Sequence, residues 1–262
     1  MAASISQARG FEVIDGYAHC GLNKYEPIDV LQKVLVTAGI SRVVIVQHLG
    51  EYDNAYLGSI ARENPSTFSC VCLVDHREPD ANEQLVHLAE SGDFKGVRLT
   101  SQVLFERPEL ATTAAKSELV IQAMPSHSPA RWVPILEDVL ERYTETLIML
   151  SHMAMPRMDE APIFETHRPV FDLARYPNVY FQLSFASRLG PYPHEPVYPV
   201  ITQAVEAFGP ERIVWGSNYP PVGGIDEYLA DLNLLLDGKL PIPADAIAAV
   251  AGINAKRFWF GE

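Results

Sequence analysis

The sequence is poor in cysteine, in basic residues and in long apolar runs, and each shortage excludes a class of protein. Its three cysteines, Cys20, Cys70 and Cys72, lie in or beside apolar runs. Because their number is odd, we interpret them as packed, reduced thiols and not as a disulfide framework. The 20 basic residues against 33 acidic ones give a formal charge of -13. This balance argues against a nucleic acid or an anionic membrane as partner.

Targeting and linker signals are also missing. The first residues, MAASISQARGFE, lack the apolar core of a signal peptide, and no apolar run reaches the length of a membrane span. We therefore expect a cytoplasmic protein. No segment rich in proline, glycine and serine divides the 262 residues, so we expect one domain over residues 1–262.

Short runs rich in β-branched residues recur along the chain and predict strands. The eight runs are Val13–Ile14, Arg42–Val46, Phe68–Val74, Gly96–Leu99, Leu119–Ala123, Leu147–Leu150, Val179–Leu183 and Arg212–Trp215. Their starts are about 23 to 33 residues apart. That spacing leaves room for one helix after each strand.

Segments with apolar residues three and four apart fill most of these gaps and predict helices. They are Ile28–Ala38, Ala55–Glu63, Asn82–Glu90, Val133–Tyr143, Phe164–Arg175, Val200–Phe208, Tyr228–Leu236 and Ala244–Phe258. The gap after the fourth run, VLFERPELATTAAKSE, has only partly helical character. Eight strands alternating with helices predict an α/β fold, a single parallel (β/α)8 TIM-type barrel. The competing fold is a doubly wound open sheet, which often has a glycine-rich first turn where this chain has YAHCG.

A barrel also predicts which side of each strand faces inward. Outward residues pack under helices and are apolar, whereas inward residues fill the barrel or reach the site. By this alternation Asp15, Tyr17 and His19 share the inner face of the first strand, and Arg98 faces inward from the fourth. The inward residues of the last two strands are Tyr180, Gln182 and Ser184 on one and Val214, Gly216 and Asn218 on the other. In LIMLSH the same rule groups Ile148, Leu150 and His152.

Polar residues gather at the carboxyl ends of the predicted strands, where active sites of such barrels lie. The candidates are His19, Gln47, His48, Asp75, His76, Arg98, Gln122, His152, Ser184 and Asn218. Two of these candidates and several further polar residues have simpler interpretations. We expect Asp75 and His76, like His127, to be loop residues, Asp15 to anchor the first strand, and His167 and His194 to take no part in chemistry.

Several motifs together resemble the amidohydrolase-2 branch of the amidohydrolase superfamily. They are IDGYAH, KGVRL, LSHMAMP, NVYFQLS and RIVWGSNYP, and they extend from Val13 to Pro221. The resemblance implies a (β/α)8 barrel that hydrolyses C–O or C–N bonds or, in one subgroup, decarboxylates unsaturated acids. It also implies a metal site built from a His-Xaa-His pair, a later histidine and a last-strand aspartate.

The chain departs from that ligand set at two positions. His19 and His152 match family histidines, but Tyr17 replaces the first histidine and Asn218 replaces the aspartate. A catalytic zinc site typically has three histidine, cysteine or carboxylate ligands. We therefore expect no tightly bound metal and no other cofactor, as the resemblance to the metal-independent pyrone-dicarboxylate lactonases implies.

The resulting hypothesis is a hydrolase of a small lactone that carries a carboxylate or hydroxyl groups. One of His19 and His152 activates water, and the other polarises the ring carbonyl with Tyr17 and Asn218. Which histidine is the base stays open. The predicted substrate-binding residues are Arg98, Gln122, Ser184, Gln47, His48 and Arg188, with Arg98 holding an anionic group.

Three alternatives remain. The same site could isomerise a lactone, the chain could be a metal-dependent decarboxylase of an unsaturated acid, or the barrel could bind a ligand without catalysis. The sequence names no particular substrate beyond a small molecule. It also leaves open whether the chain forms a homo-oligomer.

Overall fold

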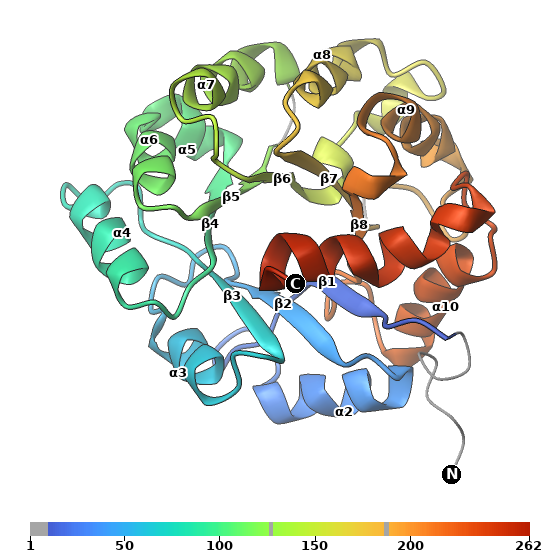
Figure 1. The fold of residues 1–262 in the computed structure, drawn as a ribbon, viewed down its shortest axis with the longest axis horizontal. Coiled ribbons are helices and arrows are strands. Elements are labelled where there is room, and N and C mark those ends of the chain that lie inside the picture. The colour runs from blue at the N-terminus through green and yellow to red at the C-terminus, as the bar shows by residue number, and fades with distance from the viewer. Residues whose placement is uncertain (1–9, 126–127, 186–188) are drawn as a thin grey trace.

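Eight parallel strands lie side by side in the order in which they occur in the chain, which confirms the predicted barrel. This computed structural model describes residues 10–125, 128–185 and 189–262. The strands are β1 (Ile14–Ala18), β2 (Arg42–Val46), β3 (Phe68–Cys72), β4 (Gly96–Thr100), β5 (Val120–Met124), β6 (Ile148–Leu150), β7 (Val179–Leu183) and β8 (Ile213–Trp215). A parallel bridge between Ala18 and Tyr219 links β1 to the segment after β8 and closes the ring (Figure 1).

Helices surround the ring and cover its outer face (Figure 1). The α-helices are α2 (Ile28–Ala38), α3 (Ala55–Glu63), α4 (Ala81–Glu90), α5 (Ser101–Glu106), α6 (Glu109–Lys116), α7 (Pro129–Arg142), α8 (Arg168–Asp172), α9 (Tyr198–Phe208) and α10 (Ile225–Leu236). Short α5 and α6 occupy the gap that was only partly helical in sequence. None of the helices in the described part of the chain is long and apolar enough to cross a membrane.

One predicted helix, Phe164–Arg175, is divided into three short pieces. These are η3 (Glu165–His167), α8 and η4 (Leu173–Arg175). Pro169 lies in the first turn of α8. Because proline has no backbone N–H, it is tolerated at a helix start but interrupts a helix interior. The apolar spacing therefore predicted the helical segment correctly, and Pro169 determines where α8 begins within it.

Side chains on the two faces of the strands belong to two separate apolar clusters. The outer cluster includes Val97, Leu99, Phe181 and Trp215 and packs under the helices. The inner cluster includes Val44, Val71, Val120, Met149, Tyr180 and Val214. The predicted alternation is therefore confirmed for β4, β7 and β8. The three cysteines are free and buried, as expected.

The C-terminal segment closes one end of the barrel. It contains η7 (Ala244–Ala246), η8 (Ala249–Ile253) and η9 (Lys256–Phe260), where one helix was predicted. Phe258 and Trp259 pack into the inner cluster, and the ring centroids of Phe258 and Tyr180 are 4.5 Å apart. Figure 1 shows this segment lying across the ring of strands. The polar strand ends lie at the opposite end.

Candidate active site

β1 contains a bulge that turns Asp15 away from the other polar residues of this strand. The pairing of β1 with β2 shifts register between Asp15 and Ala18. Asp15 accepts hydrogen bonds from the Ser217 hydroxyl at 2.6 Å and from the Tyr228 hydroxyl of α10 at 2.9 Å. The prediction that Asp15 shares a face with Tyr17 and His19 is therefore wrong. The extra residue of the bulge places the side chains before and after it on opposite faces from those that simple alternation predicts.

The anchoring role predicted for Asp15 is confirmed. Its carboxylate also accepts the backbone N–H groups of Tyr17 and Ser217. Burial raises the pKa of Asp15 to about 6, although the hydrogen bonds from Ser217, Tyr17 and Tyr228 oppose this shift. These contacts fix the end of β1 against the end of β8. They place Tyr17 beside the turn that carries Asn218.

Tyr17 lies fully buried between the two candidate histidines. Its ring centroid is 5.1 Å from that of His19 and 4.7 Å from that of His152, with edge-on contacts to both. Gly216 of the neighbouring segment makes room for it, because a Cβ at Gly216 would lie 2.7 Å from the Tyr17 Cβ. The carbonyl of Tyr17 accepts the Asn218 N–H at 2.8 Å. Four of the predicted site residues, Tyr17, His19, His152 and Asn218, therefore lie next to one another.

His19 has a defined proton position. Its Nδ1 is 2.5 Å from the Val46 carbonyl oxygen, which can only accept a hydrogen bond. The ring proton therefore lies on Nδ1 and the lone pair on Nε2. Burial, and next the positive charge of Arg98, hold the pKa of His19 well below its ordinary value. At neutral pH this imidazole is uncharged and can take up a proton at Nε2.

His152 reaches the site through a turn and not through strand alternation. β6 ends at Leu150, and the turn η1 (Ser151–Ala154) follows with left-handed backbone at His152 and Met153. The grouping of Ile148, Leu150 and His152 is therefore wrong, because the turn reverses the chain after the strand. His152 Nδ1 lies 2.7 Å from the Ser184 hydroxyl.

The environment of His152 keeps it neutral. Burial, followed by the charge of Arg98, lowers the pKa of His152 to about 3. The backbone N–H of His152 donates to the Gln182 side chain, whose amide donates to the Gly16 carbonyl at 3.2 Å. Ser184 and Gln182, both inward-facing on or after β7 as predicted, thus position His152. The site holds two uncharged imidazoles.

Arg98 supplies the positive charge near both histidines. It extends inward from β4, and its Nη1 donates to the Gln47 carbonyl at 2.9 Å, while its Nη2 contacts the Met124 sulfur. The side chain of Gln47 bonds the loop after β2, donating to the Asp53 carbonyl and accepting the His48 N–H. Gln47 therefore holds Arg98 through its backbone and the loop through its side chain.

Gln122 lies next to Arg98 in the β4–β5 pairing. Its Nε2 donates to the Ser151 hydroxyl at 2.5 Å, at the beginning of the turn that carries His152. Its Oε1 is buried and has no hydrogen-bond partner among the described residues. The amide nitrogen is thus held by Ser151, whereas the amide oxygen can accept a hydrogen bond from a ligand.

Several buried polar atoms near these residues lack a partner within the described residues. They are the Tyr17 hydroxyl, Arg98 Nε, Gln122 Oε1 and both ring nitrogens of His48. Buried polar groups in proteins are almost always hydrogen-bonded, so each such atom requires an explanation. Their concentration at one end of the barrel indicates a site built for a polar ligand.

The side chains present do not fit a divalent metal. Within the described ranges, no three histidine, cysteine, aspartate or glutamate side chains gather as metal ligands. His19 and His152 each engage Nδ1 with a protein group, so these two residues offer at most their two Nε2 atoms, where a catalytic zinc site typically has three protein ligands. Tyr17 and Asn218 supply a phenol and an amide in place of an imidazole and a carboxylate, and the Arg98 charge would repel a cation.

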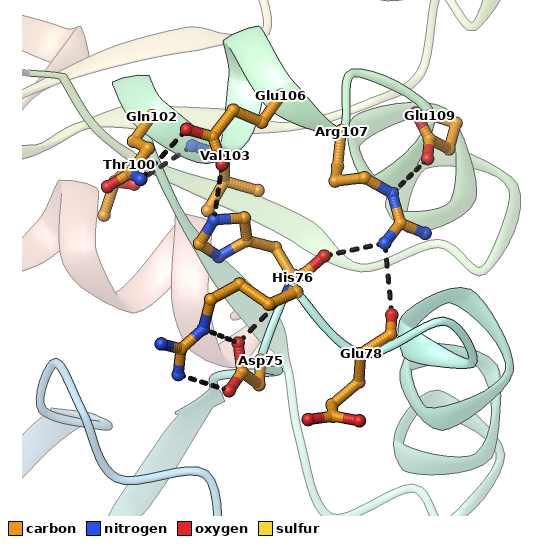
Figure 2. Close-up of polar contacts among 10 residues, drawn as sticks. Asp75, His76, Glu78, Thr100, Gln102, Val103, Glu106, Arg107 and Glu109 are labelled. Atoms are coloured by element: carbon orange, nitrogen blue, oxygen red, sulfur yellow. Dashed lines mark hydrogen bonds and ion pairs between the residues drawn. The ribbon is translucent and has the colours of Figure 1, made fainter.

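Asp75 and His76 are loop residues with their own partners (Figure 2). Asp75 pairs with Arg77 at 2.6 Å, and His76 Nε2 lies 3.0 Å from a Glu106 carboxylate oxygen. The side-chain hydrogen bond from Arg77 lowers the pKa of Asp75 to about 2. Both are therefore loop residues, as the sequence predicted, and within the described residues His76 alone of the two links the loop to α5.

Two other histidines have different surroundings. His167 is buried and makes an edge-on contact with Phe171. His194 is stacked on Phe185 and bonds Asp231 of α10 at 3.1 Å, so it joins the segment after β7 to a helix. The candidates Arg188 and His127 lie outside the described residues.

Tyr25 was missed by the sequence analysis. It lies in the loop between β1 and α2, stacks on His19 at 5.1 Å and meets His48 edge-on at 5.3 Å. Burial raises its pKa, and the nearby Arg98 charge opposes the rise. A lone loop tyrosine in NKYEP has no periodicity that marks it, since loop positions are fixed by tertiary contacts.

Comparison with known proteins agrees with the geometry. The profile of the Amidohydro_2 family, described as amidohydrolase, matches residues 15–261. The chain belongs to this family. A curated relative, the L-fucono-1,5-lactonase of Burkholderia ambifaria, is 29% identical over 245 residues, which cover 87% of this chain and 83% of that protein.

Solved structures of the same fold include further amidohydrolases. A putative 2-pyrone-4,6-dicarboxylic acid hydrolase from Pseudomonas putida has a TM-score of 0.75 and 19% identity, covering 96% of this chain and 98% of that one. An amidohydrolase from Burkholderia multivorans, solved with bound zinc, has a TM-score of 0.74 and 20% identity and covers 95% and 99%. At these identities the likeness concerns the fold.

Proposed function

We propose that this amidohydrolase hydrolyses the ring ester bond of a small lactone and needs no bound divalent metal. The observation that carries the proposal is the pair of neutral imidazoles flanking Tyr17, one of them with its Nε2 lone pair fixed by the Val46 carbonyl. The family and the lactonase relative support the reaction class. The site residues support the absence of a metal.

In this mechanism His19 is the general base. Its Nε2 removes a proton from water while the water oxygen bonds to the ring carbonyl carbon, whose π electrons move to the carbonyl oxygen. His152, which accepts from the Ser184 hydroxyl at Nδ1, donates a hydrogen bond from its Nε2–H to that oxygen and keeps its proton throughout. A neutral imidazole with a strongly lowered pKa is suited to such donation.

Three further groups complete the electrostatics. Arg98 and the amide of Asn218 stabilise the developing oxyanion or hold a carboxylate of the substrate. The ring C–O bond then breaks, and the leaving oxygen takes the proton that His19 carries. The products are a hydroxy acid and a regenerated site. Gln122, with its open Oε1, binds a hydroxyl of the substrate.

The test is a lactone panel followed by NMR analysis of the product. We expect a ring-opened hydroxy acid, zinc well below stoichiometry by mass spectrometry of the purified protein, and activity that survives chelator treatment. A rearranged lactone would support isomerisation instead. Release of carbon dioxide, or stoichiometric zinc with loss of activity on chelation, would contradict the proposal.

A further inference from the structure

A small polar pocket adjoins the candidate active site. It lies between the loop after β1 and the loop after β2 and has a volume of about 60 Å³. Its polar lining residues are Asn23, Gln47, His48, Glu51, Asp53 and Tyr56. Tyr25 joins this pocket to the site, because it stacks on His19 and meets His48 edge-on. The volume suits one or two hydroxyl-bearing carbons and excludes a second ring.

His48 is the group in this pocket that protein contacts leave unsatisfied. The residue has a relative exposure of 5%, and neither ring nitrogen has a hydrogen-bond partner within geometric limits among the described residues. Leaving a buried donor and a buried acceptor unpaired is unfavourable, because each has lost its hydrogen bonds to water. The catalytic scheme above uses neither nitrogen, so a ligand group is the natural partner.

The charges around His48 determine what that ligand group can be. Burial, and also the positive charges of Lys24 and Arg98, lower the pKa of His48, while the backbone of Leu49 and the charge of Glu51 oppose the shift. The ring is therefore neutral at pH 7 and offers one donor and one acceptor. A hydroxyl group matches both, whereas a carboxylate matches only the donor.

The opposite wall of the pocket also disfavours a carboxylate. Asn23 Nδ2 donates to Glu51 at 2.9 Å, and the Asp53 N–H donates to the other oxygen of Glu51. The side-chain hydrogen bond from Asn23 lowers the pKa of Glu51, so this residue is ionised at neutral pH. An anionic ligand would meet a like charge, while a hydroxyl could donate to it.

We propose that His48 and Glu51 form a subsite for a neutral hydroxyl-bearing arm of the substrate, which makes the substrate a polyhydroxylated lactone and not a dicarboxylate. This inference rests on the lactone hydrolysis proposed above. Tyr25 forms the wall between the subsite and His19. The ring carbonyl then lies at the imidazole pair, and the hydroxylated arm extends toward the loop after β2.

The experiment compares two lactones on matched variants. L-Fucono-1,5-lactone carries hydroxyl groups, and δ-valerolactone has the bare ring. For His48→Leu we expect kcat/KM on the hydroxylated lactone to fall about tenfold or more, mainly through KM, with less than about a twofold change on δ-valerolactone. His48→Gln retains a donor and an acceptor and should recover most of the loss. His87→Leu, on the exposed face of α4, is the control.

Other outcomes separate this inference from the proposed function. Equal losses on both lactones, or no loss on either, would overturn the subsite while leaving lactone hydrolysis intact. Wild-type preference for a dicarboxylated lactone would do the same. If the wild type hydrolyses neither lactone, the proposed function fails. Saturation-transfer NMR with L-fucono-1,5-lactone then decides the subsite, because unchanged binding in His48→Leu would overturn it.

Discussion

Two histidines at the barrel mouth differ in what their first ring nitrogen contacts. His19 faces a carbonyl, which fixes its proton on Nδ1, whereas His152 faces the Ser184 hydroxyl, which can donate or accept. This difference allows one imidazole to accept a proton while the other donates a hydrogen bond. In our proposal this difference assigns the base role to His19.

Substitution of either histidine tests this division of roles. We expect His19→Ala and His152→Ala each to lower kcat on a hydrolysed lactone by about 10²- to 10⁴-fold, since each removes a proton-transfer or oxyanion-stabilising group. Far-ultraviolet circular dichroism checks folding, and exposed His87→Ala is the matched control. Wild-type kcat in both folded variants would contradict the catalytic assignment and support a purely binding barrel.

The pH profile follows from the direction of the two pKa shifts. The pKa of His19 is held well below 6.5 and that of His152 is lowered to about 3, so both rings are neutral through the neutral range. We expect kcat/KM to stay constant as pH falls to about 6.5 and to decline only below it, when His19 becomes protonated. An inflection at or above pH 6.5 would disagree with this assignment.

Arg98 provides a second measurement on the same profile. Its charge lowers the pKa of both histidines. In Arg98→Gln the decline of kcat/KM at low pH should therefore begin at a higher pH. Without the guanidinium, protonated His19 no longer lies near a like charge, so its pKa rises. An unchanged decline in a folded, active variant would show that another group controls the profile.

At the scale of elements, the junction of β1 and β8 determines the site. The bulge in β1 directs Asp15 to Ser217 and Tyr228, and the backbone of Tyr17 pairs with the turn at Asn218. Asn218 has a φ of 58°, in the left-handed region that asparagine tolerates better than most residues. The two strands therefore present Tyr17 and Asn218 together.

Gly216 tests how closely these segments approach. A methyl group there would lie 2.7 Å from the Tyr17 Cβ and 2.8 Å from its backbone nitrogen. Because backbone cannot move aside cheaply, Gly216→Ala should lower the free energy of unfolding by about 1–3 kcal/mol and reduce kcat. Urea unfolding and steady-state kinetics measure both. Gly21→Ala is the control for the unfolding free energy, because its added methyl would make only ordinary contacts of 3.5 Å or more and its φ is not positive.

At the scale of the whole molecule, the barrel separates stability from chemistry. The carboxyl ends of the strands carry the polar candidates, and the C-terminal segment seals the other end through Phe258 and Trp259. Parallel strands all end at the same side of a barrel, so distant positions such as His19 and Asn218 converge. The apolar packing at the sealed end therefore supports the ring of strands without contacting the candidate site.

Phe258 tests that separation. Its side chain is 3% exposed and packs against Tyr180. We expect Phe258→Ala to cost about 3–5 kcal/mol of unfolding free energy through the cavity it leaves. The KM for a lactone, measured below the lowered melting temperature, should change less than about twofold. A large change in KM with little loss of stability would contradict this view.

The sequence by itself determined the strands, most of the helices and the inward side of β4, β7 and β8. Local patterns suffice there, because a residue's burial follows from alternation and from the three-to-four spacing of apolar side chains. It also placed His19, Arg98, Gln122 and Ser184 near one end of the barrel, and its motifs indicated the family that the profile match confirms.

Only the tertiary structure decided the rest. The bulge that removes Asp15 from the inner face depends on pairing with β2, and the turn that returns His152 to the site depends on Ser184 and Gln182 of β7. The place of Tyr25 likewise depends on His19 and His48. Each of these features arises from contacts between segments far apart in the chain, which no local pattern encodes.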